Sequence, residues 1–281
     1  MPSKKRYPVQ RKMNIDQPGP AANILRIDTP KFLSQINHRL YRQSRAYECK
    51  VDVHANVADG TTVDVYALAD TWYLSGALKL AKSAWDASNS EEIMMNNGKL
   101  ARWNDFRVTN TIAGSGAGRV NQYSKGALVE TAFTAGEFDN SIVVDQAGVS
   151  RTFTVGIATP TSYDIIAQYN EQSGTSADPQ FPSTSPYDGL LPNLDAAAAA
   201  AISDSGNLPP YAQAGYPNAI WVKVGTLRVE AGRQRLSTGF FSAPMGMIVL
   251  TGVGALGDTS EITLECKSGD YKGVAADSML E

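Results

Sequence analysis

The stretch 47-YECKVDVHANV-57 indicates which kind of fold the chain adopts. Apolar or small side chains occupy every second position of this stretch, beginning at Tyr47, and polar side chains alternate with them. A period of two is typical of a β-strand with one buried face and one face in water. The turn signal Asp59-Gly60 follows, and Val63 begins the alternation again, which predicts a second strand after the turn.

Further strand-like segments, separated by glycine and proline, follow along the chain. We expect them near residues 102–108, 125–134, 140–146, 150–158, 219–230, 239–252 and 260–267. A stretch with seven prolines, about 170–218, interrupts this series and contains an alanine-rich helix at 196–201. Strands of this number and length indicate an all-β fold, an antiparallel sandwich or barrel with helices inserted in its loops.

Two helices are expected before residue 100. Thr29-Pro30 is typical of a helix start and predicts an amphipathic helix over 31–45, with its cationic face turned away from the body. Asp70-Thr71 predicts the cap of a second helix, over 72–86. Residues 1–27 have no periodicity and resemble an extended arm. We therefore expect a basic arm with a short helix over 1–45 and one β domain over 46–281.

The net charge of -3 hides an uneven distribution of charge. Residues 1–50 contain eleven Lys and Arg against three acidic residues, a net +8, and the remaining 231 residues carry 14 basic against 25 acidic side chains, a net -11. A basic arm on an acidic body indicates an arm that binds a polyanion.

Candidate nucleic-acid contacts follow from this charge distribution, with phosphate attraction as the mechanism and no reading of bases. A solubility tail, a nuclear import signal or a solvated helix face would explain the same basic residues. Tyr7, Tyr41 and Tyr47 lie among them as candidate stacking platforms for unpaired bases. The candidate nucleic-acid-binding residues are Lys4, Lys5, Arg6, Arg11, Lys12, Arg26, Lys31, Arg39, Arg42 and Arg45.

Catalytic, metal and membrane functions find little support in the residues. His38 and His54 have no neighbouring cysteine or aspartate in a catalytic spacing, and two histidines cannot supply a typical metal-binding cluster. We expect no enzyme activity, no metal and no cofactor. The sequence contains no apolar run long enough for a membrane span or a secretory signal. Cys49 and Cys266 are expected to be buried, and their pairing cannot be judged from their spacing.

Several segments resemble capsid proteins of small circular, Rep-encoding single-stranded DNA viruses. The resemblance lies in these stretches: 32-FLSQINHRLYRQSRAY-47, 63-VDVYAL-68 with Asp70-Thr71-Trp72, 102-RWNDFR-107 and 269-GDYKG-273.

This resemblance implies a single antiparallel jelly roll with strands lettered B to I, of which 47–57 would be the first. It implies that the helix over 72–86 and the stretch 170–218 form the outer surface or the contacts around symmetry axes. The arm and the helix over 31–45 would face the interior. The partners would then be further copies of the chain and a single-stranded DNA genome, or RNA, because backbone contacts do not distinguish the sugars. The expected location is the virion, assembled in a host cell and, with an import signal, in its nucleus.

One alternative class of function remains open at this point. A β-sandwich that binds carbohydrate, or an adhesin-like domain, would use loops such as 170–218 to hold a glycan. The basic arm counts against this alternative, because such a domain does not need one.

Overall fold

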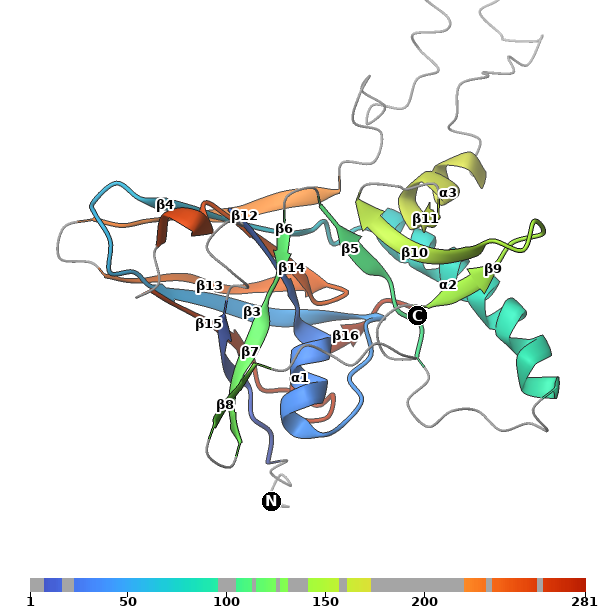
Figure 1. Ribbon diagram of the computed structural model, residues 1–281, viewed down its shortest axis with the longest axis horizontal. Helices are drawn as coiled ribbons and strands as arrows, with labels where there is room; N and C mark the ends of the chain where they lie inside the picture. The colour runs from blue at the N-terminus through green and yellow to red at the C-terminus, as the bar shows by residue number, and fades with distance from the viewer. Residues whose placement is uncertain are drawn as a thin grey trace, which may run out of the picture. The chain divides into compact units, whose positions relative to one another are not determined.

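The computed structural model shows a chain built mostly of β-strands (Figure 1). It describes residues 8–16, 23–95, 105–112, 115–124, 127–130, 141–156, 161–172, 220–230, 234–256 and 260–281. The α-helices among these residues are α1 (Thr29–Asn37), α2 (Trp72–Met95) and α3 (Ile165–Gln172), and a 3-10 turn, η1, covers Val253–Leu256.

The chain divides into two compact units. One unit consists of Met1–Ile165 together with Ile220–Glu281, and it contains all the strands that the structure describes. The other is Ile166–Ala219, of which the structure describes residues 166–172. Most of the predicted proline-rich stretch, with its helix at 196–201, lies outside the described residues.

The larger of two facing sheets, sheet A, is antiparallel throughout. Its strand order is β13 (Arg235–Pro244), β3 (Arg45–His54), β15 (Glu261–Cys266), β1 (Lys12–Asp16), β7 (Arg119–Ser124) and β8 (Ala127–Glu130), and β16 (Ala276–Ser278) also pairs with β3. The expected strand over 47–57 is thus β3, at the centre of this sheet.

The second sheet, sheet B, has five strands. Its order is β12 (Trp221–Arg228), β4 (Thr62–Leu68), β14 (Met247–Thr251), β2 (Ile24–Asp28) and β6 (Ser115–Ala117). The connections β1 to β2, β3 to β4, β12 to β13 and β14 to β15 each pass from one sheet to the other. The chain therefore alternates between the two layers of a sandwich.

The hydrophobic core lies between these two sheets. Inward-pointing residues of sheet A and sheet B form one buried cluster, which includes Ile15, Val51, Leu264, Ile27, Val65 and Leu250. In β3 the alternation predicted from the sequence is confirmed, since Tyr47, Cys49, Val51 and Val53 are all fully buried. Fully burying one such side chain stabilises the fold by about 1.5–3 kcal/mol. The alternation in the sequence therefore determines which side chains of β3 face the core of the sandwich.

A smaller third sheet departs from the antiparallel expectation. Its central strand, β10 (Ser150–Gly156), pairs in parallel with β11 (Ser162–Asp164) and β5 (Thr109–Thr111), and antiparallel with β9 (Ile142–Val144). The β2–β6 pair is also parallel. The prediction of purely antiparallel pairing is wrong for these pairs, which lie in the third sheet and at the β6 edge of sheet B.

The expected arm is structured where the chain is described. Residues 12–16 and 24–28 form β1 and β2, which pair with β15 and β14 and contribute Met13, Ile15, Leu25 and Ile27 to the core. The prediction of an arm without periodicity is wrong for these two segments. The expected boundary between arm and β domain, at residue 45, falls at the start of β3. Among the described residues β3 is the third strand, and the two strands before it already belong to the sandwich.

The two predicted helices begin as expected but end elsewhere. Asp28 caps α1, because its carboxylate accepts the Lys31 N–H at 3.1 Å, and Pro30 lies in the first turn. The helix ends at His38, which adopts the left-handed conformation with φ of 49°, so residues 39–45 are not helical. Helix α2 begins at Trp72 as predicted and continues to Met95, beyond the predicted end at 86.

The predicted strand over 239–252 is divided by a tight turn. Met245 and Gly246 have φ of 57° and 65°, and they separate β13 from β14. A Cβ atom on Gly246 would lie 2.2 Å from Cδ of Pro30. Only glycine fits here, and the turn moves the chain from sheet A to sheet B beside the start of α1.

Candidate nucleic-acid interface

The segment 38–45, between α1 and β3, carries three of the predicted nucleic-acid contacts. It is held in place from both sides. Ser34 of α1 donates its hydroxyl to the Pro30 carbonyl at 2.6 Å and accepts the Tyr41 N–H at 2.8 Å. Further along, the Gln43 side chain accepts the Val108 N–H at 2.7 Å and donates to the Val108 carbonyl at 2.9 Å, as a neighbouring strand would. The segment therefore has a fixed path.

A tight turn from the C-terminal end of the chain lies against this segment. Tyr271 and Val274 exchange two backbone hydrogen bonds, of 3.1 and 3.0 Å, around Lys272 and Gly273. Both central residues have positive φ, 49° for Lys272 and 90° for Gly273, which fits a type I′ turn. The Tyr41 hydroxyl donates to the Lys272 carbonyl at 3.0 Å, and the Lys272 ammonium donates to the Leu40 carbonyl. These bonds connect two segments that are more than 230 residues apart.

Two cationic side chains lie over the ring of Tyr271, and the charges of two further arginines act on Lys272 beside it. The Arg45 guanidinium lies 3.8 Å from the ring centroid, and the Lys272 ammonium lies 5.3 Å from it. The backbone N–H of Arg42 donates to the Tyr271 hydroxyl at 3.1 Å. Arg39 acts electrostatically on both Tyr41 and Lys272. We call Arg39, Arg42, Arg45 and Lys272 the cationic cluster.

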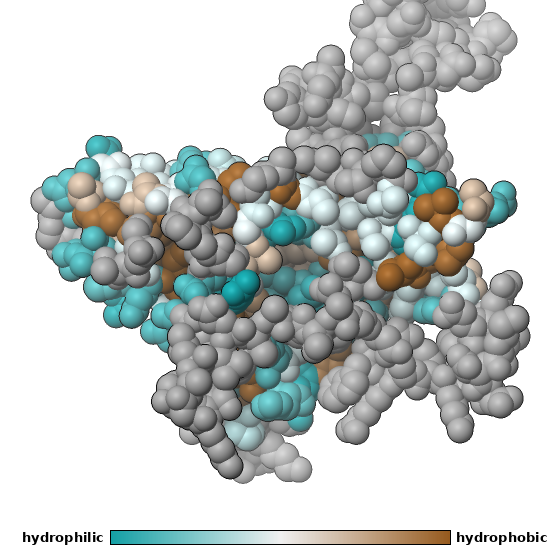
Figure 2. Space-filling model, in the orientation of Figure 1, coloured by the Kyte–Doolittle hydropathy of each residue, from teal (hydrophilic) through white to brown (hydrophobic). Residues whose placement is uncertain are grey.

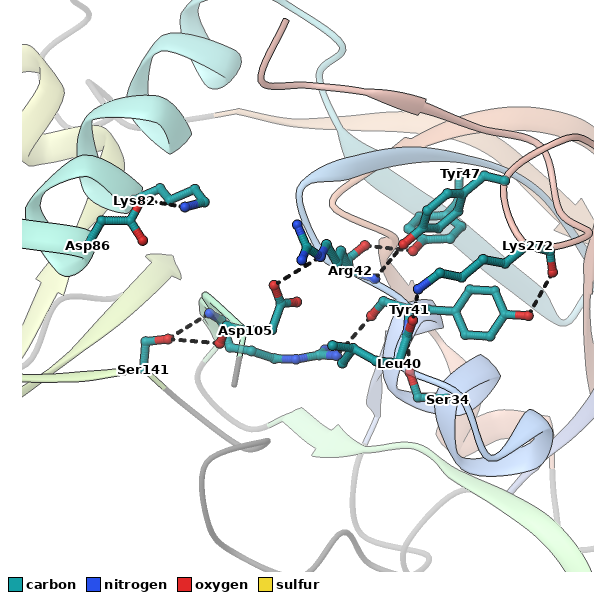
Figure 3. A network of polar contacts seen from close by, with 12 residues as sticks. Ser34, Leu40, Tyr41, Arg42, Tyr47, Lys82, Asp86, Asp105, Ser141 and Lys272 are labelled. Carbon is teal, nitrogen blue, oxygen red and sulfur yellow. Dashed lines mark hydrogen bonds and ion pairs between the residues drawn. The ribbon is translucent and has the colours of Figure 1, made fainter. Parts of the chain in front are cut away.

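The charges of this cluster repel one another. Burial lowers the pKa of Lys272, and the charges of Arg42, Arg39 and Arg45 lower it further. Asp105 opposes this effect; its carboxylate lies 3.9 Å from Nε of Arg42. Figure 3 places Arg42 between Asp105 on one side and Tyr41, Tyr47 and Lys272 on the other. Among the charges that act on the Lys272 ammonium, three arginines therefore oppose one carboxylate, Asp105.

Asp105 is itself a poor counter-charge. Its side chain is only 9% exposed, and burial raises its pKa against the opposing effects of Arg107 and Arg42. Arg107 is fully buried, with its guanidinium donating to the Tyr41 carbonyl at 3.1 Å and lying 3.7 Å from Asp28. Arg107 therefore supports segment 38–45 from inside the protein and is not part of the cationic cluster.

Three of the ten predicted contacts come together in the described part of the chain. Arg39, Arg42 and Arg45 come together in the cluster, but in the loop after α1 and at the start of β3 instead of on a helix face. Lys4, Lys5 and Arg6 lie outside the described residues. Arg11 and Lys12 lie at β1, and Lys31 lies in the first turn of α1.

Arg26 lies apart from the cluster. This residue lies in β2, where its guanidinium donates to the Asn110 carbonyl and burial lowers its pKa. It is engaged inside the fold instead of standing on a free cationic arm, because residues 24–28 alternate between the core and the opposite face of sheet B.

The prediction of stacking platforms is wrong for two of the three tyrosines. Tyr41 and Tyr47 are fully buried, and their hydroxyls donate to the backbone carbonyls of Lys272 and Arg42. Tyr7 lies outside the described residues. Tyr271 is an aromatic ring that does lie among the cationic side chains. A count of charges over residues 1–50 could not identify it, because it lies near the other end of the sequence. The one local signal is Gly273, since glycine accepts the positive φ of the second central position of this turn, but it does not indicate that the turn lies beside Arg45.

Comparison of the chain with models of known protein families, with curated proteins and with solved structures gives no significant match. In the described part of the chain, no group of three or more His, Cys, Asp or Glu side chains is arranged to hold a metal ion. No helix within the described ranges is both long and apolar enough to span a membrane.

Proposed function

We propose that the chain is a capsid subunit with a jelly-roll fold, which assembles into an icosahedral shell around a single-stranded nucleic acid and has no catalytic role. The strand order supports the jelly roll. If β1, β2, β3, β4, β12, β13, β14 and β15 are lettered B to I, the sheets contain the orders B-I-D-G and C-H-E-F. Rolling up one long hairpin, with B beside I, C beside H, D beside G and E beside F, produces this order.

The observation that carries the binding part of the proposal is the cationic cluster. Gathering three arginine charges beside the Lys272 ammonium raises the free energy of the protein unless an anion neutralises them. Phosphate groups fit such a site, because arginine donates two parallel hydrogen bonds to phosphate oxygens and lysine adds a point charge.

The cluster favours contact with the backbone of the nucleic acid. The Arg45 guanidinium covers a face of the Tyr271 ring at 3.8 Å from its centroid, so a base would have to displace it before stacking there. Phosphate contacts position a nucleic acid without reading its sequence. Packaging would therefore be independent of sequence, and the contacts would accept either DNA or RNA.

Exposed apolar side chains support self-association. Ile142 and Val144 of β9 are 55% and 61% exposed, and Val149 in the following turn is 38% exposed. Figure 2 shows hydrophobic surface gathered over β9 and β10. Exposed apolar patches mark protein contacts, and in a capsid the partner is a second subunit.

The carbohydrate-binding alternative gains no support. Its proposed site, 170–218, lies outside the described residues beyond Gln172. No structural observation therefore favours it over the capsid proposal.

The binding part is tested with a fluorescent single-stranded oligonucleotide in an anisotropy titration at several salt concentrations. The test variant replaces Arg39, Arg42 and Lys272 with glutamine, glutamine and asparagine. The control variant replaces Lys79, Lys223 and Lys267, which lie elsewhere, with glutamine. Removing three phosphate contacts should weaken binding at least tenfold. It should also reduce the slope of log K against log salt concentration by about 2, because each contact with a single strand contributes roughly 0.7 to that slope. Equal losses in both variants would contradict the proposal.

A further inference from the structure

The two cysteines of the chain face each other across neighbouring strands. Cys49 in β3 and Cys266 in β15 are direct partners in the antiparallel register. Both thiols are free, both are buried at 0% and 1% exposure, and both belong to the core on the inner face of sheet A. Their side chains therefore point to the same side of the sheet.

The backbone hydrogen bonds around Cys49 and Cys266 show whether the two residues form a hydrogen-bonded or a non-hydrogen-bonded pair of the antiparallel sheet. The Cys266 N–H donates to the Arg11 carbonyl at 2.9 Å, toward β1, and so faces away from β3. The next residue, Lys267, donates its N–H to the Glu48 carbonyl of β3 at 2.9 Å. Because backbone groups alternate sides along a strand, Cys49 and Cys266 form a non-hydrogen-bonded pair. Such pairs have the closer spacing, with Cα atoms about 4.5 Å apart.

This spacing lies within the range of about 4.4–6.8 Å over which a disulfide joins two Cα atoms. We propose that Cys49 and Cys266 form a reversible cross-strand disulfide in oxidising surroundings, which fastens β3 to β15 in the middle of sheet A. The proposal is independent of the function proposed above, since it depends only on the register of these two strands.

The reaction is thiol–disulfide exchange with a small disulfide such as oxidised glutathione. One cysteine thiolate attacks the small disulfide, forms a mixed disulfide and releases one glutathione thiol. The second cysteine thiolate then attacks the protein sulfur of that mixed disulfide and releases the second. The protein loses two protons and two electrons, and one glutathione disulfide is reduced to two thiols.

The folded protein protects these thiols from fast reaction. The hydrogen bond with the Cys49 thiol, together with burial, raises the pKa of Cys266 well above its usual range. Since the thiolate is the nucleophile, reaction in the closed sheet is slow. Oxidation should therefore proceed as the strands open, or during folding before β15 closes against β3.

The test compares two routes to the oxidised protein. In the first, folded protein is incubated with oxidised glutathione, with and without a low urea concentration. In the second, unfolded protein is refolded in a mixture of reduced and oxidised glutathione. Intact mass measures the loss of two hydrogen atoms, circular dichroism measures native structure, and thermal unfolding measures Tm. The control variant carries Cys49→Ala and Cys266→Ala.

We expect the refolded protein to lose two hydrogen atoms, keep its native spectrum and gain roughly 5–10 °C in Tm, because the bond closes a very long loop in the unfolded chain. A reducing agent should reverse the gain, and the control variant should show none. In the folded protein, urea should accelerate the same mass loss. Refolded native protein with two free thiols, or oxidised protein without native structure, would overturn the proposal.

Discussion

At the scale of single residues, Lys272 combines two features that lower stability. Its backbone has φ of 49°, which costs a residue with a Cβ roughly 1–2 kcal/mol. Its ammonium group also lies among three arginines, and burial lowers its pKa. Strained residues of this kind are found at sites where the side chain serves binding. This supports Lys272 as a ligand contact, although nothing in its local sequence marks it as basic surface.

The variant Lys272→Asn separates folding from binding. Asparagine accepts positive φ more readily than lysine, and it removes one charge from the repelling cluster. We expect the free energy of unfolding to change by less than about 1 kcal/mol, because relief of the backbone strain offsets the lost hydrogen bond to the Leu40 carbonyl, while affinity for a single-stranded oligonucleotide falls several-fold. Urea unfolding and anisotropy measure the two effects. The control is Lys267→Asn at an exposed lysine paired with Glu48, and an equal loss of affinity there would contradict the assignment.

Asp105 makes the stability of the folded protein depend on pH, in a direction that its raised pKa determines. Burial raises the pKa of this carboxyl above 3.8, so the folded protein binds this proton more tightly than the unfolded chain does. The contribution of Asp105 to stability is therefore most favourable below 3.8 and is lost as pH rises through its raised pKa. Asp105→Asn imitates the protonated group.

We expect Asp105→Asn to raise Tm near neutral pH and to leave it almost unchanged in acid. Thermal unfolding of both proteins across that range measures the difference. A variant with a lower Tm than the parent near neutral pH, and an equal Tm in acid, would instead show that the ionised carboxylate stabilises the fold through Arg42 and Arg107.

At the scale of elements, β1 determines whether the basic N-terminal region is an arm or part of the sandwich. Its register with β15 runs from Lys12 opposite Glu265 to Ile15 opposite Ile262. Ile15 is 3% exposed in the core, and Lys12 points to solvent.

Ile15→Ala should lower the free energy of unfolding by about 2–5 kcal/mol, as for other large-to-small changes in a core. Lys12→Ala, three residues away in the same strand, should change it by less than about 0.5 kcal/mol. Urea unfolding measures both. Equal and small effects would mean that β1 does not pack into the sandwich.

These elements also explain which parts of the fold the sequence predicts. The ten-residue strand β3 carries enough alternation to be recognised, and Asp59-Gly60 marks its turn, with φ of 90° at the glycine. Strands β1 and β2 have five residues each and two buried apolar positions each, which is too few to distinguish from an irregular segment. The end of α1 at His38 depends on a left-handed residue that has no glycine signal.

The candidate site is predicted only in part for a related reason. Arg39, Arg42 and Arg45 are close in sequence, so a local count of charges finds them. Tyr271 and Lys272 reach them through the pairing of β16 with β3, a contact between distant parts of the chain. No local pattern contains that information, and the burial of Tyr41 by the same turn is hidden in the same way.

At the scale of the whole molecule, the clusters alone cannot neutralise a genome. A shell of roughly 60 subunits would present about 240 cluster charges, well below the phosphates of a genome of a few thousand nucleotides. Solution cations and the basic residues before residue 8 would have to supply the remainder. The nucleic-acid content of the shells should therefore fall when the assembly salt concentration is raised.

Trp72 tests whether exposed apolar side chains serve assembly. Its side chain is 75% exposed at the start of α2, so Trp72→Ser should leave Tm of the subunit nearly unchanged while reducing the yield of assembled particles. Trp85→Ser, in the buried face of the same helix, should instead lower Tm by several degrees. Thermal unfolding and sedimentation distinguish the two. Full assembly of the Trp72 variant would remove Trp72 from the subunit contacts.

The central claim is that this chain builds a closed shell, and electron microscopy of the purified protein tests it most directly. Samples are imaged with and without single-stranded DNA, over a range of salt concentration and pH. The account predicts uniform closed particles with icosahedral symmetry, formed most readily with nucleic acid at low salt. Monomers or irregular aggregates under every condition, from protein that is folded by circular dichroism, would contradict it.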